Sequence, residues 1–192
     1  EKDAILYITE QYEKNPAITT VTHRNFNRID NFSAFLTASP AVGSWHPQLT
    51  VGVQKQWAKI EHNGETLQMD TPLFFCTLNN GIQLPYHWTL STDINFQSKG
   101  DYQNIYMYQN VFMMNATLTK SFLNEHLSIH LQGIDLTHGR KDGNRIYNKH
   151  MNMDVANVSD SRELRFTIRY KFNTAKSKYK GKGAATEEIK RL

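Results

Sequence analysis

Histidine and aspartate side chains gather in one stretch of this 192-residue sequence. His130, Asp135, His138, Asp142 and His150 are residue types that can ligate a metal ion. In an extended strand, however, His130 and Asp135 point to opposite faces, because successive side chains alternate between faces. The other three fall in a segment rich in Gly, Lys and Asn that we expect to be a loop. We therefore interpret all five as ordinary strand and loop residues, and we predict neither a metal site nor a cofactor.

Short catalytic motifs are absent from the sequence. It contains no GxSxG, HExxH, Walker loop or GxGxxG, the patterns that place a nucleophile, a zinc ion, a phosphate or a dinucleotide. The single Cys76 rules out a disulfide within the chain and a CxxC metal pair. The sequence therefore predicts a protein that is not an enzyme.

Three cationic residues lie in the last segment with regular alternation, residues 164–172. Arg165, Arg169 and Lys171 alternate with five apolar or aromatic residues, which are Leu164, Phe166, Ile168, Tyr170 and Phe172. This alternation predicts a strand with one apolar face and one wet, cationic face. The cationic face could line a pathway for an anionic ligand. Such a row more often faces water, opposing carboxylates or the residues of a plug, and we favour that interpretation.

The same alternation recurs along the whole chain, with turn-forming residues between the segments. The segments have roughly nine to eleven residues, the length that a tilted strand needs to cross a bilayer, whereas strands of soluble sheets average about five or six. No run of eighteen apolar residues could form a membrane helix. We predict an all-β fold, an antiparallel up-and-down meander of roughly ten long strands that forms part of a transmembrane β-barrel. The expected strands cover residues 3–12, 17–26, 31–39, 48–57, 73–84, 86–97, 102–120, 127–133, 145–155 and 164–172, with polar connections at 27–30, 62–70 and 98–101.

The two stripes of each strand should then meet different surroundings, lipid outside the barrel and water in its lumen. The predicted lipid-facing residues are Trp88, Leu90, Ile94, Leu164, Phe166, Ile168, Tyr170 and Phe172. The predicted lumen-facing residues are Asp93, His130, Arg165, Arg169 and Lys171. Tyr86 and Phe96 fall near the two ends of one strand, as expected of aromatic girdles at the two membrane interfaces.

The net charge of +4 is confined to the end of the chain. Residues 173–192 carry six basic and two acidic residues, so the remainder is balanced. A basic segment that contains Gly and Ala is usually solvated, and nothing in the body of the chain suggests a face that follows phosphates. We predict no nucleic-acid partner, and we divide the chain into barrel strands at 1–172 and a polar basic tail at 173–192.

Two stretches resemble a known family. Residues 118–136 (LTKSFLNEHLSIHLQGIDL) and 160–192 (DSRELRFTIRYKFNTAKSKYKGKGAATEEIKRL) look like the C-terminal end of the outer-membrane β-barrel family allied to TonB-dependent receptors. The pattern YKFN…KSKYKGKGA…E…RL is its most specific part. The resemblance extends over the whole chain and is strongest over about its last third.

This resemblance implies a role in nutrient uptake across the outer membrane of a Gram-negative bacterium. Such receptors have an N-terminal plug domain, a segment that contacts TonB, and a barrel of 22 strands. Roughly ten strands would form only part of that wall, so we expect the chain to be a C-terminal portion or a truncated product of a larger protein. The implied partners are membrane lipid, the plug, the remaining barrel strands and, through a missing N-terminal region, TonB.

A soluble all-β module that binds a ligand or a carbohydrate is the alternative. A sandwich or a lipocalin-like barrel would bring the apolar stripes together in a dry core. Leu90, Ile94, Phe166 and Ile168 would then pack in one interior, whereas in a membrane barrel all four would face outward.

The assignment of the two faces can be tested on the last strand. We expect Ile168→Arg to lower the free energy of unfolding by about 2–4 kcal/mol, the cost of arginine facing lipid near the bilayer midplane. Arg169→Gln should change it little, because a lumen residue stays in water. Folding titrations of both variants in lipid vesicles measure the two effects. Comparable losses, or a larger loss at Arg169, would show that the faces are assigned wrongly.

Overall fold

The computed structural model of the protein describes residues 2–12, 14–62, 64–147, 152–158 and 160–172. These residues form thirteen β-strands. No helix among them is long and apolar enough to cross a membrane. His150 and the predicted tail at 173–192 lie outside the described residues.

Most of the strands belong to one antiparallel sheet. Its order is β1-β2-β3-β5-β6-β9-β10-β13, with β4 paired to the far end of β3. The strands are β1 (Lys2–Tyr12), β2 (Asn15–Ala38), β3 (Trp45–His62), β4 (Glu65–Met69), β5 (Leu73–Leu84), β6 (Trp88–Gln97), β9 (Val111–Phe122), β10 (Leu127–Ile134) and β13 (Glu163–Tyr170). The predicted all-β antiparallel meander is therefore confirmed.

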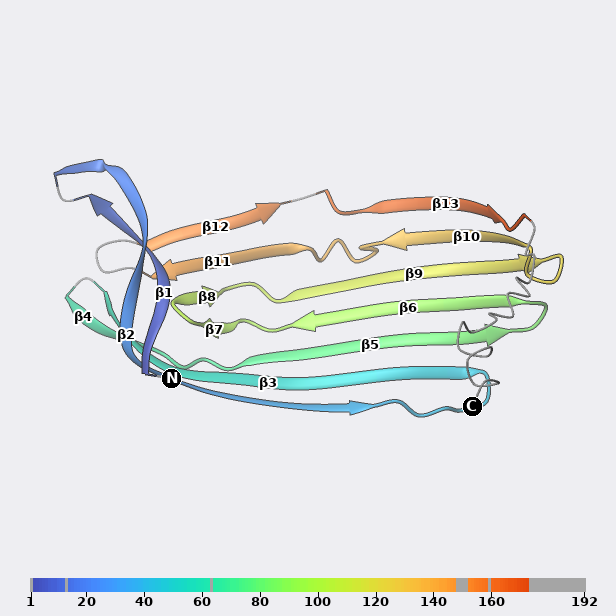
Figure 1. The fold of residues 1–192 in the computed structure, drawn as a ribbon, viewed down its shortest axis with the longest axis horizontal. Coiled ribbons are helices and arrows are strands. Elements are labelled where there is room, and N and C mark those ends of the chain that lie inside the picture. The colour runs from blue at the N-terminus through green and yellow to red at the C-terminus, as the bar shows by residue number, and fades with distance from the viewer. Residues whose placement is uncertain (1, 13, 63, 148–151, 159, 173–192) are drawn as a thin grey trace, which may run out of the picture.

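The remaining four strands form a second, smaller sheet. It has the order β12-β11-β8-β7 and consists of β7 (Gly100–Tyr102), β8 (Ile105–Met107), β11 (Lys141–Tyr147) and β12 (Asn152–Val158). The β7–β8 hairpin is inserted between β6 and β9, and the β11–β12 hairpin between β10 and β13. In Figure 1 all four strands lie beyond one end of β5, β6, β9, β10 and β13, in the region where β1 and β4 also lie.

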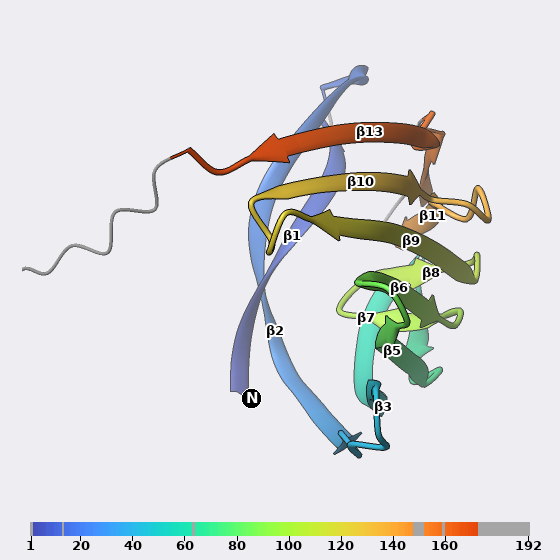
Figure 2. The ribbon, with the colours of Figure 1, turned by 90° about the vertical axis from the view of Figure 1, so that its right-hand side faces the viewer.

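The molecule thus has two parts, which we call the wall and the head. The wall comprises residues 31–38 of β2, residues 45–57 of β3, and β5, β6, β9, β10 and β13. Its strands follow one another around an arc (Figure 2). The head comprises β1, residues 15–30 of β2, residues 58–62 of β3, β4 and the second sheet.

The prediction of a break at residues 27–30 is wrong. These residues lie inside the continuous strand β2. Up to Arg28 the strand pairs with β1, and from Ile29 onward it pairs with β3, so its backbone remains paired as it changes partner. Ile29, which the sequence placed in a polar connection, is a buried core residue of the head.

The polar loop predicted at residues 62–70 is also wrong. Residues 65–69 form β4, a hairpin partner of β3, after Gly64 takes a left-handed backbone conformation with φ of 79°. Leu67 and Met69 alternate with polar neighbours and face the core of the head. That short alternation was the missed signal.

Two further expectations about strands differ from the structure. The single strand expected at 145–155 is a hairpin, in which Ile146 of β11 opposes Met153 of β12. The expected strand 102–120 is divided, because Tyr102 ends β7 and residues 105–107 form β8, and both belong to the second sheet. Tyr86 is not part of β6 but lies in the β5–β6 turn with φ of 61°.

The head has a small apolar core, and the wall does not. Ile29, Ala58, Ile60 and Met69 are buried together, and Phe26, Leu67, Tyr106 and Tyr147 pack against them. Tyr106 and Tyr147 come from the second sheet, so this contact joins the two sheets. In the wall, by contrast, Phe166 and Ile168 are 62% and 61% exposed. The dry interior that the soluble alternative requires is not found among the described residues.

Buried polar side chains fasten the head to the wall. The amide of Gln56 in β3 donates to the carbonyl of Gln103 (2.7 Å) and accepts from its backbone N–H. The carboxylate of Asp101 accepts from the backbone N–H of Thr71 (2.7 Å). Gln56 and Asp101 are both buried, and buried polar groups remain favourable only when they are hydrogen-bonded in this way.

Gly139 allows the connection between β10 and β11 to lie directly against β9. A Cβ atom at Gly139 would lie 1.5 Å from the carbonyl oxygen of Phe112, a backbone atom that cannot move without displacing the strand. We expect Gly139→Ala to lower the free energy of unfolding by about 1–3 kcal/mol or more. Gly81→Ala is the matched control, because its nearest neighbour would be 3.9 Å away. Urea titrations in lipid vesicles compare the two, and equal effects would contradict the close approach.

Candidate functional site

Strand pairing separates the wall residues into two faces. Residues opposite each other in an antiparallel ladder have their side chains on the same face of the sheet. One face is apolar across all seven strands of the wall, and we call it the apolar belt. Its rows include Ala38–Leu49–Leu78–Ile94–Met114, Leu36–Val51–Cys76–Phe96–Phe112, Trp45–Ile82–Leu90–Leu118–Leu131–Phe166 and Leu84–Trp88–Lys120–Ile129–Ile168.

Seven of the eight residues predicted to face lipid lie on this belt. Phe166 is in the same row as Leu90, Ile168 is in the same row as Trp88, and Ile94 lies in a neighbouring row. Leu164 and Tyr170 follow by alternation along β13. Phe172 lies beyond β13, and its ring packs edge-on against that of Tyr170 with centroids 4.6 Å apart. Their contact with lipid remains a prediction at this point.

The opposite face is polar, and it holds four of the five residues predicted to face the lumen. Asp93 pairs with Asn79 and Asn115, and His130 pairs with Thr119 and Thr167. Arg165 and Arg169 oppose Gln132 and Ser128. Lys171 follows the end of β13 and is fixed by its backbone N–H, which donates to the carbonyl of His126 (2.8 Å).

His130 is held between two hydroxyl groups. Its Nε2 lies 2.9 Å from the Ser128 hydroxyl and its Nδ1 lies 3.0 Å from the Thr119 hydroxyl. A catalytic serine would need a carboxylate or an amide to orient the histidine, and free backbone N–H groups to hold an oxyanion. Thr119 supplies neither group, and the backbone around Ser128 is engaged in ladders with both β9 and β13. The arrangement therefore fits structural hydrogen bonding better than nucleophilic catalysis.

Lys120 is a belt residue to which the sequence assigned no role. Its Nζ lies 5.1 Å from the ring centroid of Trp88 and 5.4 Å from that of Phe122, and it donates to the carbonyl of Tyr86. Lys55 has a similar position near the other end of the belt, 5.2 Å from the ring of Trp57. Stacking on aromatic rings at the ends of an apolar face is how lysines extend toward water. The sequence signal that was missed is the spacing of two residues, which puts Lys120 on the same face of the strand as Leu118 and Phe122.

A row of small and polar residues interrupts the belt. It runs Pro47–Asn80–Thr92–Ala116–Gly133 across five strands. The side chain of Asn80 accepts from the indole N–H of Trp45 (3.2 Å) and donates to the Thr92 hydroxyl (3.0 Å). The side chain of Leu136 lies over Gly133, where a Cβ atom would be 2.6 Å from its Cδ2. The polar atoms of this row are thus bonded within the sheet.

Asp135 is the buried centre of the connection between β10 and the head. It is 2% exposed, and its carboxylate accepts from the backbone N–H of Gly139 (2.8 Å), the backbone N–H of Arg140 (3.3 Å) and the hydroxyl of Ser161. Its own N–H donates to the side chain of Asn115 in β9 (2.9 Å). Asp135 therefore joins β9, the 135–140 connection and the segment that leads into β13.

Hydrogen bonding keeps this carboxylate charged. Burial disfavours the charged form of Asp135, but the bonds from Ser161, Gly139 and Arg140 favour it more strongly, with a smaller contribution from the charge of His138, and the pKa of Asp135 is lowered. His130 is part of the strand ladder, away from this cluster. Within the described part of the chain, no three His, Cys, Asp or Glu side chains form a group that could hold a metal ion.

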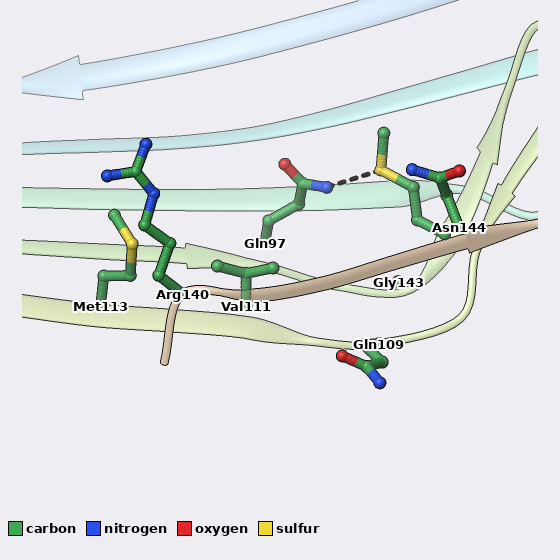
Figure 3. Close-up of a pocket in the computed structure, with 8 residues that line it drawn as sticks. Gln97, Gln109, Val111, Met113, Arg140, Gly143 and Asn144 are labelled. Atoms are coloured by element: carbon green, nitrogen blue, oxygen red, sulfur yellow. Dashed lines mark hydrogen bonds between the residues drawn. The ribbon is translucent and has the colours of Figure 1, made fainter. Parts of the chain in front are cut away.

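A pocket of about 300 Å³ lies on the polar face, where the head meets the wall. It is lined by Gln97, Met107, Gln109, Val111, Met113, Arg140, Gly143 and Asn144. Gln97 and Val111 are ladder partners, and Met113 pairs with Asn95 of the polar face. Figure 3 shows Arg140, Gln97, Met113 and Asn144 extending to the same side of the strands, with the Gln97 amide bonded to the sulfur of Met107. No sequence motif identified this site, because its residues come from three separate segments of the chain.

The contribution of Asp135 to stability should depend on pH. We expect Asp135→Asn to lower the free energy of unfolding at pH 7 by about 1–3 kcal/mol, because an amide cannot accept all the bonds that the carboxylate accepts. A lowered native pKa gives stability that is present above the unfolded-state pKa of about 4 and is lost as the pH falls through the native pKa. The gap between wild type and variant should therefore narrow below about pH 4.

Urea titrations in lipid vesicles at pH 7 and pH 3 measure this gap. Asp93→Asn serves as the control, because Asp93 is an exposed residue of the polar face, and its effect should be small at both values. A gap for Asp135→Asn that stays constant with pH would contradict the assignment.

The family model described as the outer membrane protein beta-barrel family matches residues 1–170. No curated protein and no solved structure gives a significant match.

Proposed function

The chain belongs to the outer membrane protein β-barrel family, and we propose that it forms part of the barrel wall of a TonB-dependent receptor-type transporter that imports a nutrient. Family membership places the protein in the bacterial outer membrane, in contact with lipid.

The apolar belt is the face that we assign to lipid. Phe166 and Ile168 would expose most of their apolar surface to water if this face were wet, at a cost of roughly 25 cal/mol for each Å². β5, β6 and β9 have 12, 10 and 12 residues, enough for a tilted strand to cross a bilayer. The opposite face, rich in Thr, Asn, Gln and Ser, then lines the lumen.

The two free edges of the wall carry the proposal of a larger barrel. Among the described residues, 31–38 of β2 pair only with β3, and β13 pairs only with β10. Unpaired backbone groups at such edges cannot face hydrocarbon, so further strands must cover them. The seven wall strands from β2 to β13 alternate in direction, so the first and the last run the same way. They cannot pair with each other in an antiparallel barrel, and an odd number of additional strands is needed to reach the even total of bacterial barrels.

The orientation follows from the lengths of the connections. At one end of the wall, short turns link β5 to β6 at residues 85–87 and β9 to β10 at residues 123–126. At the other end, the connections build the head. Outer-membrane barrels have short periplasmic turns and longer extracellular loops. We therefore assign the head to the outside of the cell and the short turns to the periplasm, which also puts the end of β13 on the periplasmic side.

Import rather than catalysis is the activity that these features favour. The polar face has no complete nucleophile, base and oxyanion arrangement among the described residues, whereas the pocket between head and wall opens toward the proposed lumen at its outer end. A wide, plugged barrel of this kind needs energy from TonB to release its cargo. Plug and TonB are the partners that this proposal adds to lipid.

Depletion of compounds from the growth medium tests the proposed transport whatever the cargo is. Wild-type cells, cells that lack this protein and cells that lack TonB are grown in the same complex medium, and the remaining compounds are quantified by mass spectrometry. We expect the compounds that persist without this protein to persist also without TonB, because both are needed for uptake. If those compounds still disappear from the medium of cells without TonB, the barrel is a passive channel and the proposal is wrong.

A further inference from the structure

We propose that the pocket between head and wall is a subsite for the anionic group of the imported ligand, with the guanidinium of Arg140 as its cation. The inference rests on the proposed function, because it names the ligand chemistry of a barrel that imports a nutrient.

Arg140 differs in its charge environment from three other arginines of the chain. Arg28, Arg145 and Arg165 form ion pairs with Asp30, Asp154 and Glu163. The described carboxylates include no ion-pair partner for the Arg140 guanidinium, since Asp135 is bound by the backbone N–H groups of Gly139 and Arg140. An arginine whose fork of donors is unpaired at the rim of a pocket is suited to a carboxylate or a phosphate.

The position of Arg140 is fixed by its own backbone. Asp135 holds the N–H groups of residues 139 and 140, and the close approach of Gly139 to Phe112 presses this connection against β9. The backbone of Arg140 is therefore held in place. Its guanidinium extends over the pocket, on the side to which Gln97 and Asn144 also extend (Figure 3). Such preorganisation reduces the ordering that a ligand would otherwise require.

The remaining lining defines the chemical class of the ligand. The amides of Gln97 and Asn144 can donate to an anion. Among the described residues, the Gln97 amide bonds only to the sulfur of Met107, a weak acceptor that an anion can replace. Met107, Met113 and Val111 supply an apolar surface beside these donors. The combination fits a carboxylate or a phosphate attached to a short hydrocarbon stem. The volume of about 300 Å³ is at the small end for ligand pockets, so it would hold one part of a larger compound.

Ligand-observed NMR on the intact protein in nanodiscs can test this subsite with three probes of equal chain length. The probes are hexanoate, hexyl phosphate and hexanol. We expect at least one of the two anions to bind and hexanol not to bind, and the tighter anion identifies the group that the natural ligand carries. Arg140→Gln should raise the Kd of the more tightly bound anion by about tenfold or more, as expected for loss of a charge-assisted hydrogen bond.

Two further variants keep the test specific. Arg165→Gln is the matched control, since this arginine lies on the same polar face but is paired with Glu163, and the affinity should stay within about twofold. Asn144→Asp adds a carboxylate to the pocket lining. It should weaken binding of the anion although Arg140 is still present. On SDS gels, a folded variant should show the same difference in migration between unheated and heated samples as the wild type. This comparison verifies that each variant is folded.

Hexanol binding as tightly as the anions, or unchanged anion affinity in both Arg140→Gln and Asn144→Asp, would overturn the proposal. The measurement is an equilibrium in a purified protein and does not involve TonB. If the anions do not bind but TonB-dependent uptake persists, only the proposed subsite at Arg140 is rejected. If an anion binds but uptake does not depend on TonB, the proposed transport function is rejected.

Discussion

Pairing of the backbone N–H and C=O groups within the sheet is the constraint on which the rest of the structure depends. Hydrocarbon offers these groups no water, so a spanning strand must have partners along its whole length. The wall meets this constraint with uninterrupted ladders, from Phe75–Gln97 to Leu84–Trp88 between β5 and β6, and from Trp88–Lys120 to Gln97–Val111 between β6 and β9. Residues with positive φ at the short-turn end, such as Tyr86 and Asn124, lie outside the ladders.

Because the ladders and the lipid stabilise the wall, its side chains need no common core. The head has no such support, and it is stabilised as a soluble protein is, by Ile29, Ala58, Ile60 and Met69 packed together. Where the two kinds of structure meet, backbone groups outside the ladders need other hydrogen-bond partners. Gln56, Asp101 and Asp135 are buried at this boundary and bond to backbone groups of neighbouring segments.

The sequence predicts the wall well because one rule controls it. Alternation with a period of two assigns each residue of β6 and β13 to a face, and the ladders group the same residues together. The head depends on contacts between distant segments instead. β7 and β8 have three residues each, too few to show alternation, and β2 passes through a polar stretch because it changes partner there. The pocket could not be predicted, because Gln97, Arg140 and Asn144 meet only through the register of both sheets.

The same topology separates the spanning ladders from the proposed ligand subsite. Both inserted hairpins, β7–β8 and β11–β12, leave the wall at one end, and the ladders of β6, β9, β10 and β13 are complete without them. A change in these hairpins would alter the lining contributed by Met107, Arg140 and Asn144 while every spanning ladder kept its partners. Loops carried on a rigid scaffold are where proteins usually vary their ligands. In this protein that freedom exists because the polar boundary residues, rather than the apolar belt, determine where the hairpins lie.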